Sequence, residues 1–202
     1  MTDIPIPATA IYSLVLASIS PFRKSLLARL GIPFKTYAPQ VDETPLSSES
    51  PAALVLRLAE LKARAAQLDY PNALIIGSDQ VAVNGDTILG KPQTHEQAVK
   101  QLMAVSGKPV DFLTGLCLFN TVTHSVQIDI VHFSVKFRQL TLSQIENYLH
   151  RDKPYHCAGS FKSEGLGIAL LENMMGNDPT ALIGLPLIRL VQMLETEGML
   201  VI

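Results

Sequence analysis

Residues 73–83 read Ala-Leu-Ile-Ile-Gly-Ser-Asp-Gln-Val-Ala-Val, which is an apolar run, a polar interruption and a second apolar run. The two apolar runs, Leu74 to Ile76 and Val81 to Val83, are typical of buried strands. Asp79 lies in the interruption, where burial without a partner would destabilise the protein by several kcal/mol. We therefore expect a metal ion, a cation or strong donors beside its carboxylate. The alternative is a loop aspartate that caps a turn, the commoner role of Asp in such a segment.

The composition limits the class of protein. A chain of 202 residues, of which 48% are hydrophobic, can bury one sizeable core. The net charge of −2 offers no basic surface for wrapping nucleic acid. Cys117 and Cys157 belong to no CxxC pair, so reduced thiols fit better than a structural zinc site or a disulfide scaffold. We predict a single domain over residues 1–202, made of two lobes without a separable linker.

The N-terminal segment and the hydropathy of the chain bear on localisation. Met1 to Ala10 contains Asp3 and two prolines, and no Lys or Arg precedes its apolar run, which argues against a signal peptide. No apolar stretch is long enough to span a bilayer. We therefore expect a cytoplasmic protein whose partners include neither a membrane nor a nucleic acid.

A helix start near residue 20 predicts an anion-binding site. Apolar residues from Ile11 to Ala17 indicate a core strand, and Ser20 with the proline after it is typical of a helix N-cap and first helical position. Arg23 and Lys24 follow in the first turn, where the helix dipole disfavours cations. Ser18, Ser20, free backbone N–H groups and these cations together favour phosphate binding. The alternative is that both charges point to solvent.

Three other segments carry side chains suited to metal or phosphate chemistry. Asp42 and Glu43 lie in a proline-bounded loop and could ligate a hard cation such as Mg²⁺, or could be solvated loop acids. Lys62 lies among alanines on a helix predicted to start at Ser50, where its amine either reaches a cleft or follows the surface. Lys91 stands between a glycine and a proline.

The remaining patterns predict the elements around these segments. A strand is expected over Ile32 to Ala38, and Asn84 with the glycine after it predicts a hairpin. The alternation of apolar residues between Ser125 and Phe137 changes phase after Ile130, which suggests a β-bulge. The helix after Ser50 is expected to bury Leu54, Leu58, Leu61, Ala65 and Leu68. Because strands and helices mix without regular alternation, we expect an α/β protein with a mixed twisted sheet flanked by helices and a central cleft between two lobes.

The segment from Cys157 to Gly167 is the last informative one. It combines small residues with Lys162 and Glu164. A Gly/Ser-rich loop lets the backbone approach a ligand closely, and a plain mobile loop is an equally good interpretation.

Five segments, in this order, resemble the Maf family of nucleoside triphosphate pyrophosphatases. They are Ala17 to Arg23, Val41 to Glu43, Gly77 to Gln80, Gly90 to Pro92 and Ala158 to Gly165. The resemblance covers nearly the whole chain, with Gly184-Leu185-Pro186 near its end. It implies a mixed α/β fold with a deep cleft, often in a homodimer. The implied reaction cleaves a nucleoside triphosphate between its α- and β-phosphates with a divalent metal, Mg²⁺ or Mn²⁺.

The resemblance also implies roles for single residues. The proton-accepting aspartate corresponds to Asp79, and the expected metal ligands are Glu43 and Asp79. The phosphate-binding cations correspond to Arg23, Lys62 and Lys91, to which we add the hydroxyls of Ser18 and Ser20. Lys24 stands where family members often carry a second arginine. The three positions that separate the substrate branches are occupied by Phe22, Gln80 and Glu164.

This combination is similar to the branch that cleaves 7-methyl-GTP, which usually carries an aromatic residue, Gln and Glu there. Glu164 can accept both donors of the guanine pairing edge. An N7-methylated purine is cationic, so a desolvated aromatic face such as that of Phe22 gains roughly 1–2 kcal/mol. Two alternatives stay open: a dTTP/UTP pyrophosphatase of the same family, and a non-enzymatic nucleotide-binding regulator of cell division.

Overall fold

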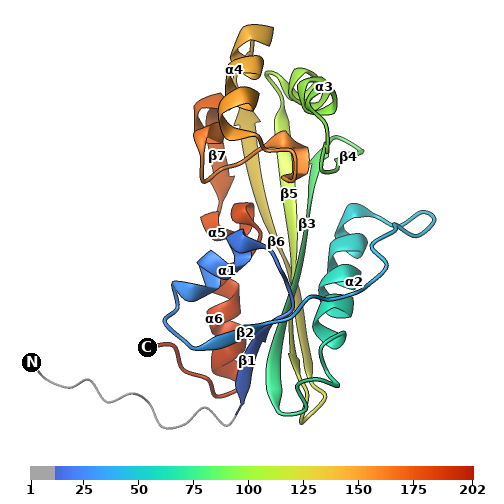
Figure 1. Ribbon diagram of the computed structural model, residues 1–202, viewed down its shortest axis with the longest axis vertical. Coiled ribbons are helices and arrows are strands. Elements are labelled where there is room, and N and C mark those ends of the chain that lie inside the picture. The colour runs from blue at the N-terminus through green and yellow to red at the C-terminus, as the bar shows by residue number, and fades with distance from the viewer. Residues whose placement is uncertain (1–11) are drawn as a thin grey trace, which may run out of the picture.

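One mixed β-sheet with helices on both faces forms the protein, which a computed structural model describes over residues 12–202 (Figure 1). The strands are β1 (Ser13–Leu16), β2 (Phe34–Thr36), β3 (Ala73–Asn84), β4 (Thr87–Leu89), β5 (Pro109–Asn120), β6 (Val126–Phe137) and β7 (Leu171–Gly176). Their order is β2-β1-β3-β5-β6-β7, and β4 pairs with β3. The first three strands are mutually parallel and the other pairings are antiparallel. The predicted mixed α/β sheet is therefore confirmed.

Six α-helices flank this sheet in the described part of the chain. They are α1 (Pro21–Ala28), α2 (Pro51–Arg64), α3 (His95–Val105), α4 (Leu142–Asp152), α5 (Pro179–Ile183) and α6 (Leu187–Thr196), with short 3₁₀ turns at Ala158–Ser160 and Leu166–Leu170. None of these helices has the length and apolar character needed to cross a bilayer. Met1 to Ala10, the segment from which no signal peptide is expected, lies outside the described residues.

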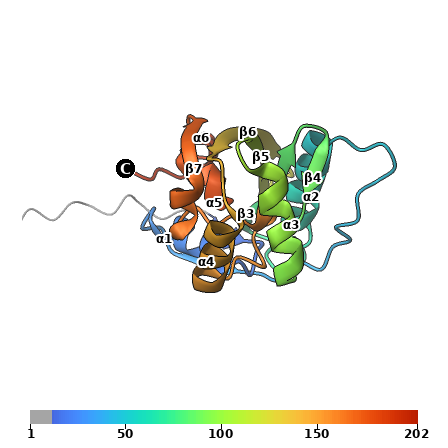
Figure 2. The same cartoon turned by 90° about the horizontal axis from the view of Figure 1, so that it is seen from above.

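The buried side chains form separate clusters at the two ends of the sheet, which gives the molecule its two lobes. One end packs α1 and α6 on one face and α2 on the other. At the opposite end, α3 and α4 cover the sheet with a cluster of their own. Figures 1 and 2 both show α3 and α4 side by side at that end. The predicted arrangement of two lobes around a central cleft follows from this division.

The N-terminal part of the chain is more regular than the sequence suggested. It runs β1-α1-β2-α2-β3, with β1 between the other two strands and the two helices on opposite faces. This is the strand–helix alternation of a doubly wound sheet, which we did not expect. In such sheets ligands bind beyond the carboxyl ends of the strands where the winding direction reverses. Here that point lies between β1 and β3.

β3 is one continuous strand, although its sequence suggested two strands and an interruption. Its first residues pair with β1 up to Ile76, and its last residues pair with β4 from Ala82 onward. Between them, Gly77 to Val81 pair with β5, and Asp79 and Gln80 of this stretch line the cleft. The interpretation of Asp79 as a loop residue that caps a turn is therefore wrong.

The buried face of α2 differs from the one predicted. Leu54 and Leu58 are buried as expected, but Leu61 and Leu68 are exposed. The positions that pack on the sheet are instead Val55, Ala59, Lys62, Ala63 and Ala66. Glycines explain this rotation, because a Cβ on Gly77 would lie 2.0 Å from the Ala59 carbonyl oxygen. A Cβ on Gly115 would lie 2.3 Å from the Val55 carbonyl oxygen. The helix backbone therefore lies directly against β3 and β5.

The β-bulge predicted within β6 is wrong. β6 pairs with β5 in an unbroken register from Val126 to Lys136. Its apolar pattern changes phase because opposite faces of the strand are covered along its length: Ile130 faces the α2 side, whereas Phe133 belongs to the cluster under α3 and α4. An irregularity does occur at Lys136 and Phe137, in the pairing with β7.

The helix N-caps and the hairpin turn predicted from short sequence motifs are confirmed. The Ser20 and Ser50 side chains accept hydrogen bonds from the third residue after them, as helix N-caps do. The hairpin after Asn84 forms between β3 and β4. The strand expected over Ile32 to Ala38 shortens to β2, and α5 and β7 were not predicted.

Candidate active site

A cleft borders the middle of β3, at the point where the winding of the sheet reverses. Residues from α1, α2, β3, the segment after β4, the 3₁₀ turn at Ala158–Ser160 and α5 line it. It has two adjoining compartments. The first contains Gln80, Phe161 and Glu164, and the second contains Ser18 and Glu43. Arg23, Lys62 and Lys91, among others, border both compartments.

The buried carboxylate of Asp79 is paired with an amine. Its Oδ1 accepts a hydrogen bond from Lys62 Nζ at 2.6 Å, and the two side chains are only 12% and 8% exposed. Lys62 also contacts Glu43 Oε1 at 2.8 Å. The alanine-rich face of α2 explains this reach, because Ala59 and Ala63 leave room for a long side chain between helix and sheet. The alternative of a lysine along the surface is therefore wrong.

The charges around Glu43 determine its ionisation. Partial burial by itself raises the pKa of this carboxyl group. The hydrogen bond and charge of Lys62, with the charges of Lys91 and Arg23, outweigh burial and leave the pKa below its ordinary value. Glu43 is thus an anion facing three cations.

A brace that the sequence analysis missed holds the loop of Glu43 (residues 37–50, the Glu43 loop) against α2. Arg57 donates from Nε to Glu49 Oε1 at 2.6 Å and from Nη2 to Oε2 at 2.7 Å. The same Nη2 reaches the Thr44 carbonyl oxygen at 3.1 Å. The hydrogen bonds from Arg57 lower the pKa of Glu49 to about 2. Asp42 accepts from the Thr44 N–H, so it closes a turn of the loop.

Arg23 is positioned by the chain segment before α6. Its Nε donates to the Gly184 carbonyl oxygen at 2.8 Å, and the Ser78 hydroxyl lies 2.9 Å from that oxygen. Burial lowers the pKa of the Arg23 guanidinium, while the charges of Asp79 and Glu43 oppose this shift. An arginine keeps its charge in proteins, so it presents a fixed cation to the cleft.

The first compartment of the cleft carries the residues expected to select the base. The Gln80 amide nitrogen donates to Thr114 Oγ1 at 3.0 Å and to the Ala181 carbonyl oxygen at 2.7 Å, which leaves its carbonyl oxygen as the group that can accept from a ligand. The Lys162 ammonium lies 5.9 Å from the centroid of the Phe22 ring. The face of Phe22 therefore already receives a cation. Glu164 is an exposed side chain at the margin of the compartment.

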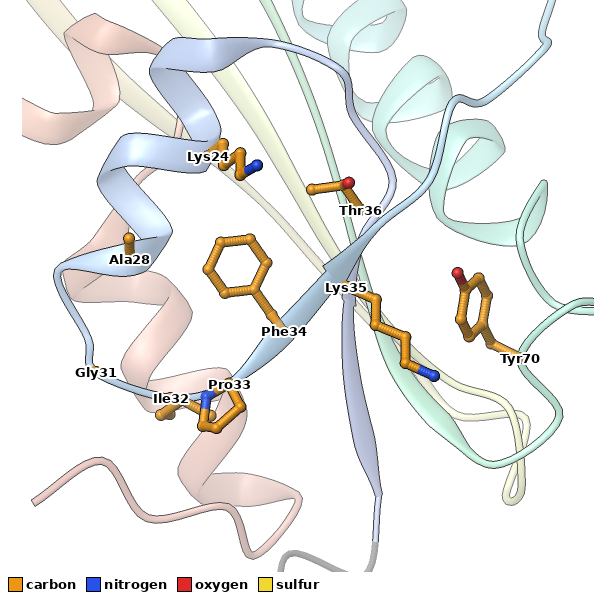
Figure 3. Close-up of a pocket in the computed structure, with 9 residues that line it drawn as sticks. All are labelled: Lys24, Ala28, Gly31, Ile32, Pro33, Phe34, Lys35, Thr36 and Tyr70. Atoms are coloured by element: carbon orange, nitrogen blue, oxygen red, sulfur yellow. The ribbon is translucent and has the colours of Figure 1, made fainter.

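All ten candidate residues line this one cleft. They are Ser18, Ser20, Phe22, Arg23, Glu43, Lys62, Asp79, Gln80, Lys91 and Glu164. Lys24 lies elsewhere, in a surface hollow beside Phe34 and Tyr70 (Figure 3). Of the two cations in the first turn of α1, Arg23 therefore borders the cleft and Lys24 lies outside it.

Some residues of the cleft were not predicted. His156 borders both compartments, and Cys157, Phe161, Leu182 and Ile183 line the first. A sequence signal existed for three of them, because Cys157 and Phe161 lie in the small-residue segment already noted and His156 directly precedes it. Burial raises the pKa of the Cys157 thiol to about 11. The thiol is therefore uncharged at neutral pH and lines the cleft as a neutral group.

The donor set fits a hard divalent cation. Glu43 and Asp79 approach one another closely enough for a single ammonium group to contact both. That ammonium marks a position where positive charge is favoured between two carboxylates. Carboxylate oxygens are the ligands that Mg²⁺ and Mn²⁺ prefer.

Comparison with known families assigns the protein to a class. Residues 13–197 match the Maf-like protein family, so the chain belongs to the Maf family. Several relatives are named 7-methyl-GTP pyrophosphatase. The one from Nitrosococcus oceani is 60% identical over 193 residues, which are 96% of this chain and 97% of that protein. Those from Vibrio cholerae and Methylobacillus flagellatus are 56% and 53% identical, over 95% and 94% of this chain and 98% of each relative.

Proposed function

We propose that this protein is a nucleoside triphosphate pyrophosphatase that hydrolyses 7-methyl-GTP to 7-methyl-GMP and pyrophosphate. One observation carries the proposal: the buried Asp79 carboxylate faces a cleft bordered by Arg23, Lys62 and Lys91. Relatives at 53–60% identity bear the corresponding name, which supports the choice of substrate.

In this mechanism Asp79 is the proton acceptor. Lys62 holds Oδ1 of its carboxylate, so we assign the proton to Oδ2. The oxygen of a water attacks phosphorus, the bond to the pyrophosphate leaving group breaks, and the water proton passes to Asp79. Arg23, Lys62 and Lys91 neutralise the negative charge that develops on the phosphate oxygens. Glu43 and Asp79 would hold a divalent cation, Mg²⁺ or Mn²⁺, which when bound further neutralises the triphosphate.

The first compartment selects the base. A guanine presents two adjacent donors on its pairing edge, and the Glu164 carboxylate can accept both. The Gln80 carbonyl oxygen, fixed by the contacts of its amide nitrogen, offers one more acceptor. The cationic 7-methylpurine suits the Phe22 face, which here receives the Lys162 ammonium instead. We propose that the base displaces this lysine.

A substrate panel tests the proposal. Pyrophosphate release is measured with 7-methyl-GTP, GTP, UTP and dTTP, each in Mg²⁺, in Mn²⁺ and after chelation of divalent cations. We expect the highest kcat/KM for 7-methyl-GTP and loss of turnover with the chelator. Higher kcat/KM for UTP and dTTP would favour the pyrimidine enzyme. Nucleotide binding without metal-dependent pyrophosphate release would favour the regulator of cell division.

The compartment and the assembly of the protein are also proposals. The thiols of Cys117 and Cys157 are free, which suits a reducing cytoplasm where nucleotides occur. A homodimer, which the family resemblance implies, remains a prediction that sedimentation of the purified protein will test.

A further inference from the structure

A cluster of two histidines and a glutamate joins α3 to α4 outside the cleft. His95, at the start of α3, has its Nε2 atom 2.7 Å from Oε2 of Glu146. His150 follows Glu146 by one helical turn, and its Nε2 lies 3.6 Å from the same oxygen. Two nitrogens and one oxygen, one ligand atom from each residue, all lie within 4.8 Å of one another. The two imidazole rings stack with centroids 5.1 Å apart.

From this geometry we infer a binding site for a borderline transition-metal cation, Zn²⁺ or one of similar chemistry. Zinc binds imidazole nitrogen and carboxylate oxygen at about 2.0–2.2 Å in tetrahedral sites, which places ligand atoms about 3.3 Å apart. The 2.7 and 3.6 Å separations bracket that spacing, so small side-chain rotations suffice. Three protein ligands leave a fourth position for water. Imidazole ligands favour Zn²⁺, whereas the oxygens of Glu43 and Asp79 favour Mg²⁺.

Tyr155 supplies a supporting contact. Its hydroxyl lies 3.0 Å from Nδ1 of His95 and 3.5 Å from the Leu149 carbonyl oxygen, to which it donates. The hydroxyl oxygen can therefore accept a hydrogen bond from the Nδ1–H group, which leaves Nε2 free to ligate. Histidines that bind metals commonly donate their other ring N–H in this way.

The position of the site links it to the cleft. Lys91 and His156 both border the cleft. His95 is four residues after Lys91, and Tyr155 directly precedes His156. The Gln93 N–H also donates to the Tyr155 carbonyl oxygen at 3.1 Å. A cation shared by α3 and α4 would therefore fix two cleft-bordering segments relative to each other. Figure 2 shows the two helices beside one another.

Zinc binding to the whole protein tests the inference. ZnCl₂ is titrated in excess Mg²⁺, which occupies oxygen ligands, and binding is followed by calorimetry and by the rise in Tm. We expect one site whose Kd rises at least tenfold in H150A and in H95A. His150 is 71% exposed, so its replacement should leave the fold intact if H95A does not fold. H132A is the matched control, because His132 pairs with Asp111 alone at 3.1 Å, and it should bind zinc as the wild type does.

Cobalt provides a second readout. Co²⁺ bound by two imidazoles and a carboxylate in a tetrahedral site should give a visible absorption band that H150A lacks and D79N keeps. Equal zinc affinity in the wild type and H150A would overturn the inference. So would a lack of saturable zinc binding up to millimolar concentration. Neither outcome depends on pyrophosphatase turnover.

Discussion

Two hollows of the described residues, the one beside Lys24 and the one beside Asp79, both contain lysines and aromatic residues, but only the second brings acids and cations together. The hollow of Figure 3 has a volume of about 780 Å³, and Tyr70 is its one lining residue from outside residues 24–36. The compartment beside Asp79 has about 140 Å³, yet its lining comes from six separate parts of the chain. Size therefore does not distinguish a functional site. What distinguishes it is that opposite charges from distant segments of the chain are brought together.

The two hollows also differ in how their cations are held. Lys62 is almost completely buried between two carboxylates, whereas Lys24 is exposed on α1. A buried charge is stable only with partners, so the cleft depends on the folded structure in a way that the surface hollow does not.

The largest effect is expected for D79N. Loss of the proton acceptor should lower kcat for 7-methyl-GTP by roughly 10²–10⁴-fold. Circular dichroism should show an unchanged fold. The control is D86N, because Asp86 lies exposed in the turn after the same strand, and its kcat should equal that of the wild type. Undiminished pyrophosphate release by D79N would refute the assignment of Asp79.

K62M and K24M compare the two hollows directly. Removing one partner of a buried ion pair destabilises proteins by about 3–5 kcal/mol, and we expect a loss of that order for K62M in urea unfolding. K24M should change the free energy of unfolding by less than about 0.5 kcal/mol. The double variant K62M/D79N should be less destabilised than the sum of the single variants. Equal effects of K62M and K24M would remove the distinction between the hollows.

E164Q tests the base end of the cleft. A hydrogen bond to a charged group contributes about 1.5–3 kcal/mol, so kcat/KM for 7-methyl-GTP should fall by roughly 10–100-fold. The value for UTP should change much less, because UTP lacks the paired donors of guanine. E172Q, at an exposed glutamate on β7, is the control. A parallel loss for both nucleotides would show that Glu164 does not select the base.

G77A tests whether the close contact of α2 with β3 creates the cleft. The added Cβ would lie 2.0 Å from the Ala59 carbonyl oxygen and 2.7 Å from the Ala63 nitrogen, so the helix must move. We expect a loss of about 1–3 kcal/mol in the free energy of unfolding, together with a lower kcat because Lys62 moves too. G90A is the control for stability, since no atom lies within 4 Å of the added Cβ. Wild-type stability in G77A would show that the helix adjusts freely.

The smallest effect concerns pH and the brace of the Glu43 loop. The folded pKa of Glu49 is lowered to about 2 from an ordinary value of 4.5. The brace therefore stabilises the protein fully above pH 4.5, and the stabilisation is lost as pH falls from 4.5 toward 2. E49Q should thus have a lower Tm than the wild type at pH 7, and the difference should shrink as pH falls through this window. A difference that stays constant with pH would contradict the role of the Glu49 charge.

The sequence by itself determined the features that depend on neighbours in the chain. The caps at Ser20 and Ser50 form between a side chain and a backbone N–H three residues away, and the hairpin after Asn84 depends on one turn. Such contacts are readable because both partners stand in the same short segment. The ordered motifs likewise identified the family and the residues of the cleft.

Tertiary structure alone decided how those residues meet. Lys62 became buried because Gly77 and Gly115 let α2 rotate and pack closely on the sheet. The phase change in β6 reflects which helices cover each end of the strand. Contacts of this kind join residues far apart in the chain, and no local pattern encodes the distance or rotation between them.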